Sequence, residues 1–231
     1  MGHTNGVPVL GTVFFPQNVS GGKVEWLDQT LAQKSDGSFP VADKLIEVAT
    51  TYGFDGWFIN QETEGENETS LGADYATKMQ AFIAYLKKQA PDLRVVYYDS
   101  MTKDGSIDWQ NALTDENSMY MTDGDHPIAD EMFLNFWWTE DKLAGDDLLA
   151  ASATKAKELG IDPYSLYAGI DVQADGYDTP VKWNLFAGKD GKTHTSLGLY
   201  CPSWAYWSAG NPTTFRKTRV VYGLTMRVIH R

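Results

Sequence analysis

The chain has 231 residues, a formal net charge of −12 and 42% apolar residues. This length suits one large α/β domain, and the apolar content is sufficient for a sizeable core. The negative charge argues against nucleic acid and anionic membrane surfaces as partners, so neutral ligands are expected. Because Cys201 is the single cysteine, an internal disulfide and a thiolate metal cluster are both excluded.

Strand and helix patterns alternate along the first half of the chain. Residues 7–15 form a nearly continuous apolar run before Pro16, which predicts a strand buried on both faces. Residues 42–52 have helical periodicity and stop at Gly53, a typical helix C-terminal cap. The next predicted elements are strands at 56–62 and 94–99, separated by a helix at 73–90.

The alternation continues through the second half. The predicted elements are strands at 118–122, 132–137, 166–172 and 196–200, and a helix at 146–159. Such alternation favours a parallel α/β sheet, either a (β/α)8 TIM barrel missing part of its start or an open doubly wound sheet. Polar residues end several of the strands, as at the catalytic rim of a barrel. Their spread over many strands favours the barrel.

Asn60 and Glu62 end the strand at 56–62, and their spacing places both on one face of it. Phe58 is expected behind them in the barrel interior, and Gln61 is expected to point to the other face. A carboxylic acid at such a rim, flanked by aromatic residues, should have a raised pKa and can protonate a glycosidic oxygen. The alternative for this short pattern is a structural cap or turn.

The amide next to Glu62 indicates a particular kind of glycosidase. Most glycosidases add a second carboxylate as nucleophile or base, which Asn60 cannot replace. An amide is suitable if the substrate is a 2-acetamido sugar, whose own carbonyl oxygen attacks the anomeric carbon. Asn60 would then orient the acetamide, while Glu62 donates a proton to the leaving group and later removes one from water.

The segment at residues 54–63 (FDGWFINQET) resembles the catalytic strand of family 85 glycoside hydrolases, the endo-β-N-acetylglucosaminidases. The resemblance extends over about residues 5–215, with further matching segments at 5–12, 97–101, 136–138 and 169–172. It implies a (β/α)8 barrel that hydrolyses the GlcNAc-β-1,4-GlcNAc bond in the core of N-linked glycans. It also implies that no metal or organic cofactor is needed.

The resemblance implies roles for three catalytic residues. Asn60 matches the family's acetamide-orienting Asn, and Glu62 matches its general acid/base. Tyr98 stands where the family has a Tyr close to the reacting acetamide. Tyr97 would take this place if the strand register differed by one residue.

Aromatic substrate contacts are implied in the same way. Trp109 and Trp137 fall where the family has substrate-contacting aromatic residues, and Trp138 is the alternative to Trp137. Phe136, directly before Trp137 and Trp138, is included among the residues predicted to bind the substrate.

Other residues at strand ends are candidates on their own chemistry. Asp99 and Asp171 either bond sugar hydroxyls or cap local structure. Trp204 follows the last strand and either lines a glycan subsite or packs at the rim. The acidic segment 123–126 (DGDH) is expected to be a turn, and no metal site is predicted.

The two ends depart from the family pattern. Family members have two further strands before the position of Asn5, so the barrel is expected to lack its first two βα units and to expose an unpaired edge. Residues 216–231 contain five Lys or Arg and no acid, in an otherwise acidic chain. We expect a catalytic barrel at 1–215 and, after a one-base frameshift near Phe215, a non-native tail at 216–231. An ordinary basic tail is the alternative.

The sequence thus predicts a retaining endo-β-N-acetylglucosaminidase that acts on an N-linked glycan or glycopeptide. Two alternatives stay open: an inactive truncated barrel that only binds glycan, and a chitinase-like hydrolase, which usually has a carboxylate where Asn60 stands. No nucleic-acid or membrane partner is expected, and the oligomeric state is left open. A cytosolic location is favoured for the chain as given, with secretion as the alternative.

Overall fold

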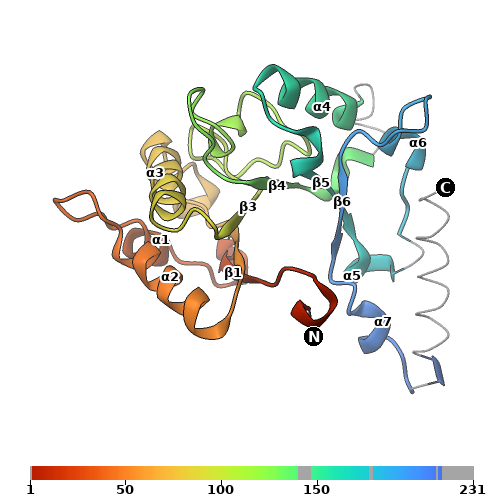
Figure 1. The fold of residues 1–231 in the computed structure, drawn as a ribbon, viewed down its shortest axis with the longest axis horizontal. Coiled ribbons are helices and arrows are strands. Elements are labelled where there is room, and N and C mark those ends of the chain that lie inside the picture. Colours follow the sequence, from red (N-terminus) through yellow and green to blue (C-terminus); the bar gives the residue numbers. More distant parts are fainter. Residues whose placement is uncertain (1, 140–146, 177–178, 212, 215–231) are drawn as a thin grey trace.

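The computed structural model describes residues 2–139, 147–176, 179–211 and 213–214 (Figure 1). In this part of the chain six parallel strands form one sheet, in the order in which they occur in the sequence. The strands are β1 (Leu10–Phe15), β2 (Gly56–Gln61), β3 (Arg94–Tyr98), β4 (Glu131–Leu134), β5 (Leu166–Asp171) and β6 (Ser196–Tyr200). They follow an arc in Figure 1, with β1 and β6 at the two edges.

α-Helices separate most successive strands, one follows β6, and the longer ones cover the outer side of this arc (Figure 1). They are α1 (Val24–Thr30), α2 (Pro40–Tyr52), α3 (Ala73–Gln89), α4 (Leu148–Glu158), α5 (Val172–Asp175), α6 (Trp183–Phe186) and α7 (Trp204–Trp207). Sequential parallel pairing is the order of a (β/α)8 barrel, whereas a doubly wound sheet changes direction at a switch point. The predicted α/β barrel architecture is therefore confirmed, as a barrel that stays open between β1 and β6 in the described residues.

Local sequence signals account for the ends of the longer helices. Pro40 begins α2, and Gly53 ends it in the left-handed conformation, with φ 73°. Lys87 and Lys88 lie in the last turn of α3, where positive charge suits the helix dipole. The carboxylate of Asp147 caps α4 by accepting a hydrogen bond from a backbone amide of its first turn, at 3.1 Å.

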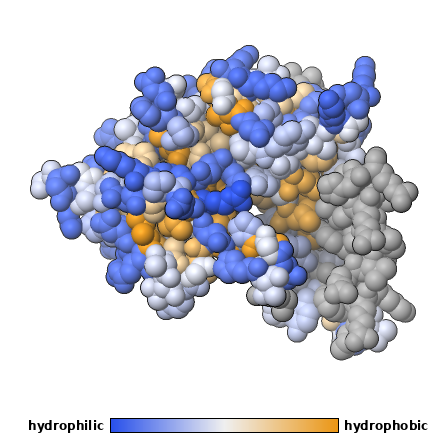
Figure 2. Space-filling model, viewed as in Figure 1, coloured by the Kyte–Doolittle hydropathy of each residue, from blue (hydrophilic) through white to orange (hydrophobic). Residues whose placement is uncertain are grey.

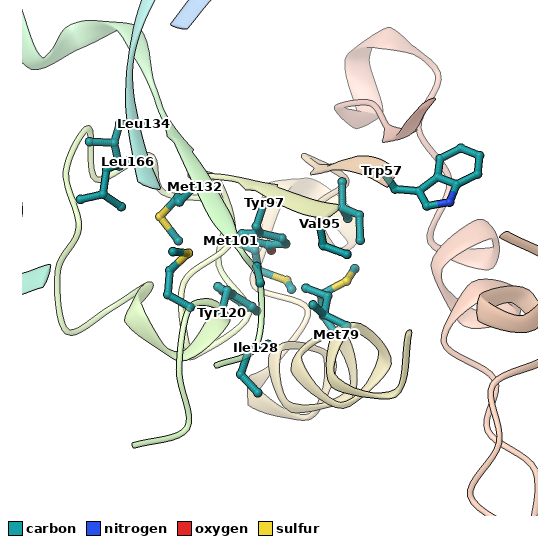
Figure 3. Close-up of a cluster of buried hydrophobic side chains, with 14 of the residues drawn as sticks. Trp57, Met79, Val95, Tyr97, Met101, Tyr120, Ile128, Met132, Leu134 and Leu166 are labelled. Atoms are coloured by element: carbon teal, nitrogen blue, oxygen red, sulfur yellow. The ribbon is translucent and has the colours of Figure 1, made fainter. Parts of the chain in front are cut away.

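The hydrophobic core lies between the outer face of the sheet and the helices. Figure 3 shows side chains of β3 and β4, among them Tyr97 and Met132, directed toward Met79 of α3 and toward Tyr120. The rings of Tyr97 and Tyr120 stack with centroids 4.2 Å apart. Because side chains alternate along a strand, burial of this set leaves every second residue on the inner face of the sheet.

One predicted strand is wrong. Residues 118–122 contain the 3-10 helix Ser118–Tyr120 (η4), whose backbone makes local hydrogen bonds, such as that from the Met121 amide to the Ser118 carbonyl at 2.9 Å. The apolar character of this segment comes from the packing of Tyr120 into the core, where it is fully buried, and not from a place in the sheet. Hydrophobicity alone does not separate these two cases.

A second strand is shorter than predicted. Strand β4 ends at Leu134, and a 3-10 helix, Phe136–Thr139 (η5), follows it. The amide of Trp137 donates to the side-chain oxygen of Asn111 at 2.9 Å. The Asn111 side chain thus accepts the hydrogen bond that a neighbouring strand would have accepted if β4 continued to Trp137.

Two further observations complete the fold. The predicted tail, residues 216–231, lies outside the described residues. Among the helices that the structure describes, none has the length and apolar content needed to cross a membrane.

Candidate active site

A cavity of about 670 Å³ lies on the inner face of the sheet, at the carboxyl ends of its strands. Its walls include residues of β1, β2 and β3 on one side and the end of β6 on the other. The cavity is rich in aromatic residues, and two of them are substantially exposed: Phe14, at 54%, and Tyr200, at 44%. On the face shown in Figure 2, apolar side chains also reach the surface near its centre, between areas of hydrophilic residues.

Asn60 is the middle residue of a row that crosses three strands. Phe14 of β1 is paired in register with Asn60 of β2, and Ile59 is paired with Tyr97 of β3, so Tyr98 is next to Asn60. Phe14, Asn60 and Tyr98 all line the cavity. Tyr97 is fully buried on the helix-covered side. The structure thus places Tyr98, and not Tyr97, beside the predicted catalytic pair.

Asn60 and Glu62 contact each other directly. Nδ2 of Asn60 donates to Oε1 of Glu62 at 2.8 Å. Oδ1 of Asn60 is buried and has no hydrogen-bond partner among the described residues. A buried acceptor without a partner costs stability, so it indicates a place where a ligand donates. Gln61 points to the opposite face, as predicted, and is fully buried there.

Glu62 combines partial burial with the absence of a neutralising charge. Burial raises the pKa of its carboxyl above the ordinary value, and the hydrogen bond from Asn60 lowers it in part. Within the described residues Glu62 forms no ion pair, and it is the single carboxylic acid among those that line the cavity. A carboxyl in this setting can hold a proton closer to neutral pH and donate it to a bound molecule.

The hydroxyl of Tyr98 is held from behind by Asn135. It donates to Oδ1 of Asn135 at 2.6 Å, and Asn135 is itself buried. Burial, followed by the nearby carboxyl of Glu62, raises the pKa of the Tyr98 phenol. The phenol therefore keeps its proton and a defined orientation next to Asn60.

Asp99 lies beneath the cavity and not in its wall. Only 1% of it is exposed, and its carboxylate accepts hydrogen bonds from the Asn117 side chain (2.8 Å) and from the amides of Gln110 (3.3 Å) and Asn135 (3.4 Å). Burial raises the pKa of this carboxyl to about 6. Its oxygens accept hydrogen bonds inside the protein, an arrangement that fits the structural alternative for Asp99.

The predicted aromatic residues fall in two places. Phe136 lines the cavity. Trp109 and Trp137 pack edge to face, with ring centroids 6.2 Å apart, and lie outside the cavity wall. Trp137 is 47% exposed, whereas Trp138 is buried and donates its indole N–H to a backbone carbonyl of β5 at 2.8 Å. The exposed member of the Trp pair is therefore Trp137.

Asp171 and Trp204 make structural contacts and do not line the cavity. Asp171 caps α5, since its carboxylate accepts a hydrogen bond from the Ala174 amide at 3.2 Å. Trp204 packs over Gly176, where a Cβ atom would lie 2.4 Å from the indole ring. These positions fit the structural alternatives named for the two residues, a cap for Asp171 and packing for Trp204.

The acidic segment 123–126 forms a turn. Oδ1 of Asp123 accepts hydrogen bonds from the amides of Asp125 and His126, at 2.9 and 2.7 Å. In the described part of the chain, no three His, Cys, Asp or Glu side chains lie close enough to hold a metal ion.

The cavity also contains residues that the sequence did not indicate. Phe14, Gln17 and Ser20 come from β1 and the loop after it. The predicted strand end at Pro16 was an available signal, because barrel sites are built from such ends. Cys201 lines the cavity from a left-handed backbone conformation, with φ 51°, which no sequence pattern indicates.

Comparisons with known proteins agree with one another. The family model described as Glycosyl hydrolase family 85 matches residues 1–222. Cytosolic endo-beta-N-acetylglucosaminidase 2 of Arabidopsis thaliana is 30% identical over 216 residues, and cytosolic endo-beta-N-acetylglucosaminidase of Danio rerio is 31% identical over 214 residues. The glycoside hydrolase domain of Endo-D from Streptococcus pneumoniae R6 has a similar structure, with a TM-score of 0.78 and 34% identity.

The matches cover most of this chain but a smaller share of the other proteins. They include 91% and 88% of this chain, but 27% and 26% of the length of the two relatives. For the Endo-D structure the shares are 92% of this chain and 33% of the other. The chain therefore spans about a quarter to a third of these proteins.

Proposed function

Because the chain belongs to glycosyl hydrolase family 85, we propose that it is an endo-β-N-acetylglucosaminidase that hydrolyses the GlcNAc-β-1,4-GlcNAc bond of an N-linked glycan core. The pair Asn60 and Glu62 carries the proposal, because it joins a proton-donating carboxyl to an amide with an unpaired acceptor. The names of the relatives support the type of bond cleaved and also a cytosolic location.

The first step uses Glu62 as an acid. Burial raises the pKa of this carboxyl, which favours its protonated form, and the proton passes to the glycosidic oxygen as the C1–O bond breaks. The carbonyl oxygen of the substrate's 2-acetamido group forms a new bond to C1 from the opposite side. The products are a free GlcNAc hydroxyl on the leaving side and a cyclic oxazolinium-type intermediate.

Asn60 orients the acetamide for this attack. Its buried Oδ1 atom is placed to accept a hydrogen bond from the acetamide N–H, which turns the acetamide carbonyl toward C1. Its Nδ2 atom at the same time holds Glu62 at 2.8 Å. Tyr98, fixed by Asn135, forms the adjoining wall and limits the movement of the acetamide.

The second step reverses the role of Glu62. As a carboxylate it removes a proton from water, and the water oxygen attacks C1 from the face that the leaving group occupied. The C1–O bond to the acetamide breaks, the acetamide is restored, and the configuration at C1 is retained. Glu62 is protonated again, so the cycle closes.

The composition of the cavity favours this route over a two-carboxylate mechanism. A second carboxyl would be expected about 5 to 9 Å from the first. Among the described residues that line the cavity, Glu62 is the single carboxylic acid. A nucleophile supplied by the substrate fits this arrangement.

Release of a fluorescent N-glycan from a glycopeptide tests the proposal. Wild-type protein is compared with Glu62→Gln and with Glu66→Gln, an exposed Glu of the following loop. Glu62→Gln should lower the rate by about 10²- to 10⁴-fold, the usual contribution of a general acid. Glu66→Gln should match the wild type, and both variants should remain folded.

Other outcomes identify the alternatives. Equal rates for wild type and Glu62→Gln would remove Glu62 as the acid. A folded wild type that binds the glycan and does not cleave it would favour a binding protein. Cleavage of chitin oligomers in preference to the N-glycan would favour a chitinase-like hydrolase.

A further inference from the structure

A buried carboxylate holds the chain where it leaves strand β4. The amide of Asp99, directly after β3, donates to the Phe133 carbonyl of β4 at 2.9 Å. A regular parallel ladder would continue with a hydrogen bond from the Asn135 amide to the backbone carbonyl of Asp99. The structure directs this amide to a carboxylate oxygen of Asp99 instead, at 3.4 Å. The position of Asn135 therefore depends on the Asp99 side chain.

The other carboxylate oxygen of Asp99 binds the loop after β3. It accepts from the Asn117 side chain at 2.8 Å and from the Gln110 amide at 3.3 Å. Burial raises the pKa of Asp99 to about 6 against the effect of these hydrogen bonds, so the carboxyl is mainly ionised at neutral pH. A carboxylate only accepts, whereas the amide of Asn has one oxygen and one donor group. Asn at this position could therefore not accept from both sides.

Asn135 connects Asp99 to the wall of the cavity. Its Oδ1 atom accepts from the Tyr98 hydroxyl at 2.6 Å, and the residue is only 3% exposed. Tyr98 lines the cavity beside Asn60, whereas Asp99 and Asn135 lie behind the cavity wall. A change at Asp99 thus reaches the cavity in two steps, through Asn135 and then through the Tyr98 hydroxyl.

We propose that Asp99 is a positioning residue for the reaction: through Asn135, its carboxylate fixes the Tyr98 hydroxyl and so the wall that limits the movement of the substrate acetamide. This inference rests on the function proposed above and adds a residue that acts without touching the substrate. Loss of the carboxylate should affect the orientation of the acetamide for attack more than the binding of the glycan. The effect is therefore expected in kcat and not in KM.

A double-mutant cycle tests this role with the fluorescent glycopeptide. Asp99→Asn should lower kcat about tenfold and change KM by less than about twofold, because one side of the carboxylate loses its hydrogen bonds. When Tyr98→Phe is already present, Asp99→Asn should lower kcat by less than about twofold, since the hydroxyl through which it acts is absent. A general disturbance of the strand ends would lower kcat equally in both backgrounds.

Ser152→Ala is the matched control. The hydroxyl of Ser152, a fully buried residue of α4, accepts from the Leu113 amide of the loop after β3 at 2.9 Å. Its loss disturbs the same loop and leaves the contacts of Asn135 and Tyr98 intact, so kcat should not change.

Asn135→Ala removes the middle of the connection. It should repeat both results of Asp99→Asn, namely a lower kcat with Tyr98 present and little further effect after Tyr98→Phe. Urea denaturation shows whether each variant is folded, and Asn135→Ala decides the question if Asp99→Asn does not fold.

The results separate the positioning role from the proposed function. The role is overturned, and the proposed function stands, if folded Asp99→Asn or Asn135→Ala keeps the wild-type kcat, changes KM alone, or lowers kcat equally with and without Tyr98→Phe. If the folded wild type does not cleave the glycopeptide, the proposed function is overturned, and the positioning role with it.

Discussion

Carboxylates at the amino ends of the strands differ from those at the carboxyl ends in whether a positive charge pairs with them. At the amino ends, the carboxylate of Glu131 contacts the Arg94 guanidinium at 3.1 Å and the Tyr167 hydroxyl at 3.0 Å. Asp130 likewise contacts the Lys87 ammonium at 2.9 Å and accepts from the Val95 amide at 2.7 Å. Both of these negative charges are matched by a positive one.

At the carboxyl ends the described structure has no such matching. Burial raises the pKa of Glu62 and raises that of Asp99 to about 6, and no cation of the described residues pairs with either. Charge at the amino ends thus stabilises the fold, as is general for that end of a barrel. At the carboxyl ends the protein keeps a carboxyl of raised pKa and an unpaired acceptor, at a cost in stability, where a substrate can use them. Four predictions test this contrast.

The largest effect is expected for Asn60→Ala. In the proposed mechanism Asn60 orients the acetamide, so its loss should reduce glycan release by about 10²- to 10³-fold, as for other groups that act on the reacting oxygen. Stability should change by less than about 1 kcal/mol, because the substitution also removes a buried acceptor without a partner. Glycopeptide cleavage and chemical denaturation measure the two effects. If Asn60→Ala lost much stability and kept its activity, Asn60 would serve the fold and not catalysis, which would contradict the contrast between the two ends of the strands.

Glu131→Ala should show the opposite profile. It removes the Arg94 contact, which is partly exposed to solvent, and the hydrogen bond from Tyr167. We expect a loss of about 1 to 2 kcal/mol in the free energy of unfolding, and unchanged activity per folded molecule. Exposed Glu158, in the last turn of α4, supplies the control variant Glu158→Ala, which should have little effect. A catalytic defect in folded Glu131→Ala would argue against a purely structural role.

A smaller effect is expected for the stability of Glu62→Gln as a function of pH. The folded-state pKa of Glu62 is raised, so the wild type loses stability as pH rises through that pKa and Glu62 ionises. Glu62→Gln avoids this loss and should be the more stable protein at about pH 7. The difference should disappear below the ordinary Glu pKa of 4.5. Urea titrations at about pH 7 and pH 3 measure it, and a variant less stable than wild type at neutral pH would contradict the burial argument.

The smallest effect, with the opposite sign, is expected for Asp55→Asn at the amino end of β2. The Val9 amide, at 2.6 Å, and then His3 lower the pKa of Asp55. Its stabilisation is therefore present above the ordinary Asp pKa of 3.8 and is lost as pH falls through the folded-state pKa. Asp55→Asn should be less stable than wild type at about pH 7 and equal to it in strong acid. The same urea titrations measure this difference in stability. If the stabilities of Asp55→Asn and Glu62→Gln changed with pH in the same direction, the distinction between the amino and carboxyl ends of the strands would not hold.

Much of the fold and the central pair follow from local patterns. The period of two along β2 correctly predicts that Asn60 and Glu62 share a face and that Gln61 points to the other, where the structure shows it buried. Sequential strand–helix alternation predicts the parallel order of the sheet. These features depend on neighbouring residues, so the sequence carries them directly.

Features that depend on distant contacts could not be predicted in this way. The apolar segment around Tyr120 looks like a strand, but it packs on Tyr97 as part of a 3-10 helix. Asp99 looks like a binding residue at a strand end, but loops far along the chain bury it. Gln17 is unremarkable in sequence, and Asn18, through contacts across 46 and 47 positions, brings its loop to the cavity. Such positions need the three-dimensional structure.

The alternation of β2 has a consequence for a saturation mutational scan. Positions 57, 59 and 61 face the core and are 5%, 1% and 0% exposed, whereas 58, 60 and 62 line the cavity. Selection for protein abundance should therefore deplete substitutions at positions 57, 59 and 61. Selection for glycan cleavage should deplete substitutions at positions 58, 60 and 62. One short strand carries two interleaved sets of constraints, and selection can act on either set with little change in the other.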